Sequence, residues 1–104
     1  MATTDDDHLQ QLAGEFGDRV RRRRDELDLT QEAASVVTGI SVTTYQKIEN
    51  GHRMPRLENV VKLIQGLELE PNALFGGLGG LLPERTERAV PGRRRRSSRL
   101  ARDA

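Results

Sequence analysis

The stretch LTQEAASVVTGISVTTYQKIENG, residues 29–51, constrains the fold most strongly, because it marks both ends of two short helices. Thr30 and Ser41 carry hydroxyls of the kind that cap a helix N-terminus. Gly39 and Gly51 suit the C-terminal ends, since glycine adopts positive φ without strain. We therefore predict helices over 31–38 and 42–50, joined by a tight turn that contains Gly39.

A longer amphipathic segment precedes this pair. Its apolar residues recur at helical spacing and are Leu9, Leu12, Phe16, Val20 and Leu27. Gly14 and Gly17 interrupt the segment, and a glycine in an exposed helix costs about 1 kcal/mol relative to alanine. We therefore expect the first helix to begin near Glu15. A shorter, separate or frayed helix would precede it, with the acidic residues 5–7 at its N-terminus.

Two more helices are predicted after residue 51. The fourth has an apolar stripe of Leu57, Val60, Val61, Ile64 and Leu67, with Gly66 near its end. Pro71 suits the first position of a fifth helix, in which Leu74 and Phe75 are expected to face inward. Neither strands nor an internal repeat are predicted. The expected fold class is all-α, a compact domain of five helices.

Charge divides the chain unevenly. Residues 1–75 hold nine Lys and Arg against thirteen Asp and Glu, a net of −4, whereas residues 76–104 hold eight Arg against three acids, a net of +5. The last segment has too few apolar residues to order itself as a core. We predict an acidic and in part helical N-terminal extension over 1–14, a folded domain over 15–76, and a Gly-rich exit with an Arg-rich, disordered tail over 77–104.

Several classes of protein are disfavoured by what the sequence lacks. It has no cysteine, and its two histidines are scattered, so neither a metal site nor a catalytic set is expected. The GGLGG stretch is followed by Leu-Leu-Pro and lacks the Lys-Ser/Thr of a phosphate-binding loop. No apolar run approaches the roughly 20 residues of a membrane helix. We expect a cytoplasmic protein that is not an enzyme and needs no cofactor.

Two short helices joined by a tight turn, the second opening on small polar residues, describe a helix-turn-helix. The second helix would present one face to the domain and the other to a DNA major groove about 12 Å wide. Ile40, Tyr45 and Ile48 are the apolar positions expected to anchor it. The groups left for base edges are Val42, Thr43, Thr44, Gln46 and Lys47.

Residues 16–75 resemble the phage-repressor/Cro-like helix-turn-helix family, also called the XRE family. The matching features are Leu-Thr-Gln-Glu at the start of the second helix, Gly-Ile-Ser at the turn, Ile-Glu-Asn-Gly at the end of the third helix, then a proline and a final Leu-Phe. Each feature alone is weak, but their order and spacing are specific. The resemblance implies a DNA-binding domain in which the third helix reads bases.

The resemblance also implies roles for individual residues. Val42, Thr43, Thr44, Gln46 and Lys47 fall on positions that face bases or the nearby backbone. Positions that contact phosphates in the family correspond to Gln31, Ser41, Asn50, His52, Arg53 and Arg56. Glu49 matches a largely structural glutamate and is not expected to touch DNA.

The chain departs from the family pattern at several positions. Val42 and Thr43 stand where related repressors often carry glutamine, so two-point reading of adenine is not available there. Contact with thymine methyl groups and single hydrogen bonds from threonine would replace it. Lys47 is the best candidate for a guanine contact. Thr38 replaces an apolar residue, which predicts looser packing of the second helix.

Two arginine clusters have alternative interpretations. Residues 21–24 wrap around the first helix, so most are expected to be solvated or paired with Asp18, Asp25 or Asp28, and one or two to reach phosphate or a partner. Arg93, Arg94, Arg95 and Arg96 could form a disordered arm that contacts DNA non-specifically. The competing interpretation for both is an arginine bias of codon usage, because only two of the seventeen cationic residues are lysine.

The leading hypothesis is a sequence-specific regulator of transcription that binds double-stranded DNA. One recognition helix covers few base pairs, which favours a homodimer on a palindromic operator. Leu74, Phe75, Leu78, Leu81 and Leu82 offer apolar surface for that dimer. The alternative is an interaction protein of the same fold, an antitoxin or an adaptor for RNA polymerase or another regulator, with a protein partner bound through the C-terminal segment.

Overall fold

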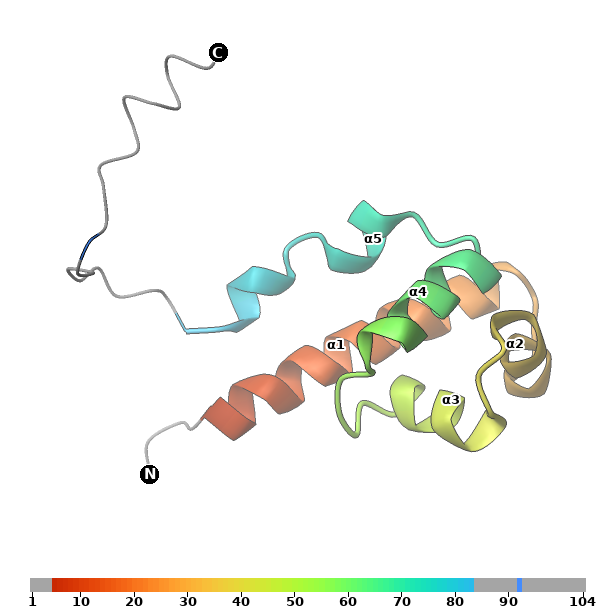
Figure 1. Ribbon diagram of the computed structural model, residues 1–104, viewed down its shortest axis with the longest axis horizontal. Coiled ribbons are helices and arrows are strands. Elements are labelled where there is room, and N and C mark those ends of the chain that lie inside the picture. Colours follow the sequence, from red (N-terminus) through yellow and green to blue (C-terminus); the bar gives the residue numbers. More distant parts are fainter. Residues whose placement is uncertain (1–4, 84–91, 93–104) are drawn as a thin grey trace, which may run out of the picture.

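The computed structural model describes residues 5–83 and residue 92, and five α-helices account for most of them. The elements in chain order are α1 (Asp5–Glu26), α2 (Gln31–Thr38), α3 (Val42–Glu49), α4 (Leu57–Gly66), α5 (Pro71–Phe75) and a 3-10 turn, η1 (Leu78–Leu81). The long helix α1 crosses the structure, with α3 below it and α5 above it in the view of Figure 1. No strand occurs in the described residues, and the expected all-α class is confirmed.

The ends of α2 and α3 follow from local hydrogen bonds. The Thr30 hydroxyl accepts a hydrogen bond from the Ala33 amide at 3.0 Å, which caps α2. Gly39, at φ 74°, ends α2 and donates its amide to the carbonyls of Ser35 and Val36. The Ser41 hydroxyl caps α3 in the same way as Thr30 caps α2. The predicted positions of both caps and of the glycine turn are therefore confirmed.

One hydrophobic core joins the helices. Its largest fully buried side chains come from four of them and from the turn after α4, and are Tyr45, Phe16, Leu63, Leu67, Leu74 and Val20. Ile40, Tyr45 and Ile48, the expected anchors of the third helix, are all buried. Thr38 is buried too, and its hydroxyl donates to the Ala34 carbonyl at 2.7 Å, so its polar group is satisfied inside α2.

The prediction that the first helix begins near Glu15 is wrong, because α1 is continuous from Asp5. Its glycines mark places where helices approach each other. A Cβ on Gly17 would lie 2.7 Å from the Glu49 carbonyl oxygen and closer still to that of Ile48. A Cβ on Gly51, which has φ 71°, would lie 2.8 Å from the Cα of Gly14. The helix-weakening effect of glycine is offset by this close packing of α1 on the end of α3.

The predicted apolar stripe of α4 is partly wrong. Val60 and Leu63 are buried, and Ile64 packs against the core. Leu57 and Val61 instead point outward, with exposed fractions of 76% and 54%. The buried set follows the i, i+3, i+4 spacing of one helix face, whereas the predicted stripe mixed two faces.

The segment after α4 turns back onto α1. Leu74 is fully buried as expected, but Phe75 is 44% exposed, so the prediction that it faces inward is wrong, although its ring centroid lies 6.3 Å from that of Phe16. Leu78 in η1 is 7% exposed. Leu74 and Leu78 therefore belong to the core of one chain, which corrects their assignment to a dimer surface.

Candidate nucleic-acid interface

The outward side of α3 carries short polar groups and one cation. Thr43 and Lys47 are exposed, and Lys47 follows Thr43 by four residues, so they lie on one line along the helix. Val42, Thr44 and Gln46 are half-buried beside that line, and Asn50 is exposed just after the helix. Because Tyr45 and Ile48 fill the opposite side, α3 presents this one face to the outside.

The start of α3 is fixed by a pair of hydroxyls. The Ser41 Oγ accepts from the Thr44 amide at 3.2 Å and donates to the Thr44 Oγ1 at 3.0 Å. The Ser41 hydroxyl is thus committed inside its own helix, while the Thr44 hydroxyl keeps its proton for an outside acceptor. Of these two residues, Thr44 is the better placed to donate to a phosphate or a base.

A series of hydrogen bonds between side-chain amides connects the outer face of α3 to the interior. The Gln46 Nε2 donates to the Gln31 Oε1 at 3.2 Å, and the Gln31 Nε2 donates to the Glu49 Oε1 at 3.1 Å. Gln31 and Gln46 are thereby held in fixed orientations. The sequence assigned both to DNA contact but gave no sign that they touch each other, because their hydrogen bond joins different helices.

At the inner end of this series of hydrogen bonds, Glu49 forms an ion pair with Arg24 that the sequence did not reveal. The Arg24 guanidinium donates to both oxygens of Glu49, at 2.6 and 3.0 Å, and to the Leu29 carbonyl at 2.9 Å. The Glu49 side chain is fully buried. The structural role expected for Glu49 agrees with this burial, and Arg24 joins α1 to α3 through it.

The electrostatics of this pair favour the ionised forms. Burial by itself would raise the pKa of the Glu49 carboxyl, but the contacts with Arg24, Tyr45 and Gln31 outweigh it, so that pKa is lowered. The hydrogen bond to Glu49 raises the pKa of Arg24. Burial, and then the nearby Glu49 carboxylate, raise the pKa of Tyr45. Among the described residues, the buried Tyr45 hydroxyl has no partner at hydrogen-bond geometry.

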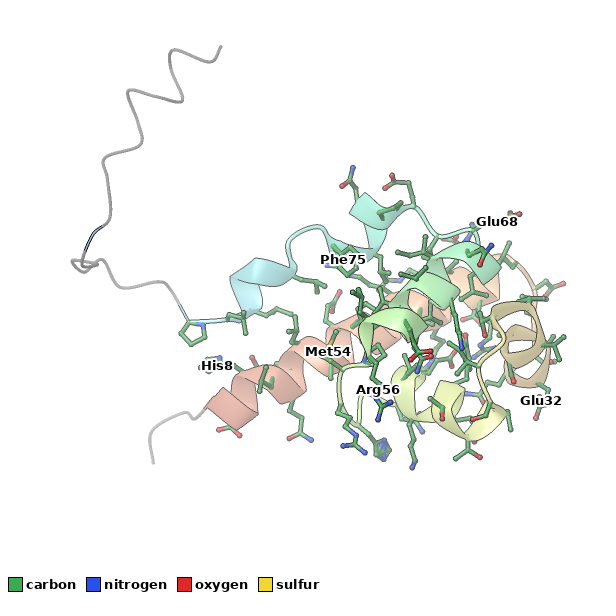
Figure 2. The ribbon with its side chains drawn as sticks, viewed as in Figure 1. His8, Glu32, Met54, Arg56, Glu68 and Phe75 are labelled. Atoms are coloured by element: carbon green, nitrogen blue, oxygen red, sulfur yellow. The ribbon has the colours of Figure 1, made fainter. Side chains whose placement is uncertain are left out.

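The turn from α3 to α4 gathers exposed cations around an open hollow of about 530 Å³. Lys47, Arg53 and Arg56 line it together with Thr44, and Glu58 lies at its α4 side. Figure 2 shows Arg56 and Met54 at this turn. Within the described part of the chain, no hydrogen bond or ion pair engages the side chains of Lys47, Arg53 or Arg56. These three charges are therefore available to an outside anion.

The arginines of α1 are used differently. Arg19 donates to the Leu74 carbonyl at 3.1 Å and the Gly76 carbonyl at 2.6 Å, and Arg23 donates to the Leu67 carbonyl at 2.9 Å. They hold the C-terminal ends of α5 and α4. This gives them a structural role, in addition to the solvation and acidic pairing expected for residues 21–24.

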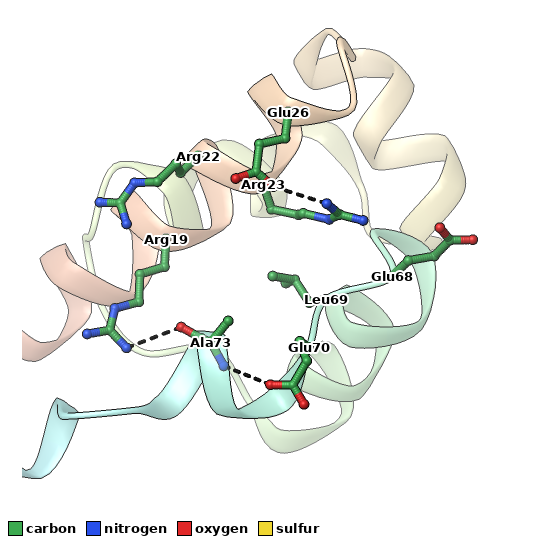
Figure 3. Close-up of a pocket in the computed structure, with 8 residues that line it drawn as sticks. All are labelled: Arg19, Arg22, Arg23, Glu26, Glu68, Leu69, Glu70 and Ala73. Atoms are coloured by element: carbon green, nitrogen blue, oxygen red, sulfur yellow. Dashed lines mark hydrogen bonds and ion pairs between the residues drawn. The ribbon is translucent and has the colours of Figure 1, made fainter.

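A second hollow, of about 380 Å³, lies between α1 and α5 (Figure 3). Its basic side chains are largely engaged, because Arg19 also reaches the Ala73 carbonyl at 3.4 Å and Arg23 pairs with Glu26 at 3.0 Å. Glu68 and Glu70 face the same hollow. Mixed charge and internal hydrogen bonds make this hollow a poor site for a polyanion.

The other residues predicted to contact DNA are His52 and the C-terminal arginines. His52 is exposed in the turn after α3, as the contact predicted for it requires. Arg93, Arg94, Arg95 and Arg96 lie outside the described residues.

Among the described residues, no group of His, Cys, Asp or Glu has an arrangement that holds a metal ion, and no helix has the length and apolarity to cross a membrane.

Comparison with known proteins gives a consistent result. A family model described as a helix-turn-helix matches residues 20–74. The cryptic phage CTXphi transcriptional repressor RstR of Vibrio cholerae is 36% identical over 59 residues, which cover 57% of this chain and 53% of the repressor. The control protein C.MunI of a Mycoplasma species is 33% identical over 64 residues, which cover 61% of this chain and 86% of that protein. The chain thus spans about half of the repressor and most of the control protein.

Proposed function

The chain belongs to the XRE-type helix-turn-helix family of DNA-binding regulators, and from that membership we propose that it reads a specific duplex sequence with α3 and thereby regulates transcription. The relatives named above are called a transcriptional repressor and a control protein, which supports a regulatory role. The proposed mode of action is binding rather than catalysis.

The observation that carries the proposal is that three unengaged cations gather beside α3, whereas four of the five arginines of α1 make hydrogen bonds or ion pairs within the fold. Arg19, Arg23 and Arg24 are engaged inside the fold, whereas Lys47, Arg53 and Arg56 surround an open hollow beside the exposed face of α3. Unengaged cations next to short polar side chains suit a surface that grips phosphates and contacts base edges.

In this proposal, different residues read the bases and contact the phosphates. Thr43 and Lys47 enter the major groove with Gln46 at its edge, and Val42 offers an apolar contact to thymine methyl groups. The remaining positions, Gln31, Asn50, His52, Arg53 and Arg56, set the register on the backbone. Ser41 caps α3, and the Thr44 hydroxyl next to it donates a hydrogen bond to the DNA in its place. A homodimer on a palindromic operator places two recognition helices about one helical turn apart.

Selection of binding sites from a random duplex pool tests the proposal. The full chain is used at about 0.15 M salt, because lower salt inflates non-specific binding. We expect enrichment of a palindrome. Failure of well-folded protein to enrich any sequence would contradict sequence-specific reading and favour the interaction-protein hypothesis.

Single substitutions then separate base reading from phosphate contact. Thr43→Ala should cost about 1–3 kcal/mol on the selected site and relax the preference at one base pair. Arg53→Ala should weaken binding to all sequences and reduce the salt slope by about 1. Arg22→Ala is the matched control, since Arg22 lines the hollow between α1 and α5, away from α3. Equal effects of Arg53→Ala and Arg22→Ala would contradict the phosphate assignment.

A further inference from the structure

One side of α1 packs directly on α3, and Arg21 lies on that side. Gly17 is one turn before Arg21, and a Cβ at Gly17 would lie 2.7 Å from the Glu49 carbonyl oxygen. Because no side chain separates the two helices at Gly17, the next turn of α1 lies against the last turn of α3. The Arg21 Nε is there 3.9 Å from the Glu49 Oε1, while 51% of the Arg21 side chain remains exposed.

The contact with Glu49 leaves the donors of Arg21 unused. A separation of 3.9 Å is longer than a hydrogen bond. The Glu49 carboxylate is already bonded at 2.6 and 3.0 Å to Arg24, whose positive charge balances it. Asp18 and Asp25, the acidic neighbours of Arg21 on α1, form no ion pair with it in the part of the chain that the structure describes. The Arg21 guanidinium therefore keeps its hydrogen-bond donors for a group outside the protein.

Gln31 on α2 places a second free donor beside Arg21. The Gln31 Nε2 donates to the same Glu49 Oε1 at 3.1 Å, and the Gln31 Oε1 accepts from Gln46 at 3.2 Å. Since a carboxylate only accepts hydrogen bonds, the amide is fixed with its nitrogen toward Glu49 and Arg21. One of the two Nε2 protons is bonded to Glu49, and the other is free. Unused donors from two helices thus lie close together beside α3.

We propose that Arg21 and Gln31 together bind one phosphate of the DNA backbone, which extends the DNA surface of α2 and α3 onto α1. This inference rests on the proposed function and adds to it a contact from another helix. The planar guanidinium suits phosphate, since it donates several hydrogen bonds in a fixed geometry. Arg21 supplies the charge at this place, because Gln31 is neutral and Arg24 is balanced by Glu49. A base edge is a poorer partner, because Arg21 belongs to α1 and not to the exposed face of α3.

The neighbouring Arg22 provides a matched control. Arg22 is exposed like Arg21, but it lines the hollow between α1 and α5 (Figure 3). Adjacent residues of a helix point about 100° apart. Replacing either arginine by alanine removes one positive charge from α1, so the two variants differ in the face that loses the charge and not in net charge.

Salt titrations of duplex binding by the full chain test the inference. At about 0.15 M salt, Arg21→Ala should bind both the selected duplex and a duplex of scrambled sequence about tenfold more weakly than the wild type. The slope of log affinity against log salt concentration should fall by about 0.9. Arg21→Lys should keep most of that slope because it keeps the charge, and Arg22→Ala should keep all of it. Circular dichroism verifies that each variant is folded.

A double-variant cycle tests whether Arg21 and Gln31 share a phosphate. Arg21→Ala and Gln31→Ala each remove a donor to the same group, so the two substitutions should not act independently. The double variant should lose less affinity than the product of the two single losses. Losses that simply multiply would refute the sharing.

Two further results would overturn the assignment of Arg21. They are equal slopes for Arg21→Ala and Arg22→Ala, and a change of base preference in Arg21→Ala. Failure of the proposed function has a different signature. A chain that selects no sequence, but whose Arg21→Ala variant loses slope on the scrambled duplex, would refute specific reading alone. One that selects a site while Arg21→Ala behaves as Arg22→Ala would refute only the contact by Arg21, and one that binds no duplex at all would refute both.

Discussion

The Arg24–Glu49 pair has consequences for both stability and recognition. Its carboxylate is buried and accepts from two donors of Arg24, and Gln31 and Gln46 extend the network to the outer face of α3. Removing Glu49 takes away the acceptor of both Arg24 donors, and removing Arg24 leaves the Glu49 carboxylate buried without its cation. The same pair that stabilises the fold thus also orients the amides that border the proposed DNA surface.

Glu49→Gln should therefore destabilise the protein at neutral pH by about 1–3 kcal/mol, because the Arg24 it leaves behind is 15% exposed and lies 3.7 Å from Asp25. Since the folded-state pKa of Glu49 is lowered, its contribution is present above the unfolded pKa of about 4.3 and is lost as pH falls through the folded-state pKa. Urea unfolding between about pH 2 and pH 7 measures this. The free energies of unfolding of wild type and variant should converge toward the acid end, and curves that stay parallel would contradict the assignment.

The sequence predicted α2 and α3 well because their ends depend on local signals. Thr30, Gly39 and Ser41 act on amides within a few residues of themselves, and such caps can be recognised without knowing the fold. The partner of Arg24 is 25 residues away and was not predictable from spacing. The apolar face predicted for α4 was partly wrong for a related reason, since Val60 and Val61 are both apolar and packing decides which one is buried.

The glycines of α1 give a test of helix packing. Gly17→Ala should lower the free energy of unfolding by about 1–3 kcal/mol, because the added methyl group meets backbone carbonyls of α3 that cannot rotate away. Gly14→Ala is the matched variant, and a Cβ there has nothing within 4 Å. It should raise the free energy of unfolding by about 0.5–1 kcal/mol through helix propensity. Thermal and urea unfolding compare the two, and equal effects would refute the close contact at Gly17.

Over the whole chain, the proposed DNA surface draws on few of the cations. The segment over residues 1–75 has a net charge of −4, and three of its nine basic residues line the hollow beside α3. Because the net charge of this segment is negative, its attraction for DNA is confined to the surroundings of cations such as these three. The segment over 76–104, with a net charge of +5, is the larger source of positive charge.

Deletion of residues 92–104 should reduce the dependence of DNA affinity on salt. Each phosphate that the arginines of this segment neutralise contributes about 0.9 to the slope of log affinity against log salt concentration. The base preference should stay the same, because the proposed base contacts belong to α3. Titrations of the selected duplex at several salt concentrations compare the deletion with the full chain. An unchanged slope would show that Arg93, Arg94, Arg95 and Arg96 do not contact DNA.

The eight residues of α3 also bear on how such a regulator evolves. Its anchors, Tyr45 and Ile48, are buried, whereas Thr43 and Lys47 are exposed and their side chains make no hydrogen bond or ion pair with any other described residue. Mutations at these two codons alter the proposed readout while leaving the packing intact. Gln46 is bound to Gln31 and lacks that freedom. After gene duplication, single substitutions at these positions would therefore give the two copies separate DNA targets, and each intermediate protein would still fold.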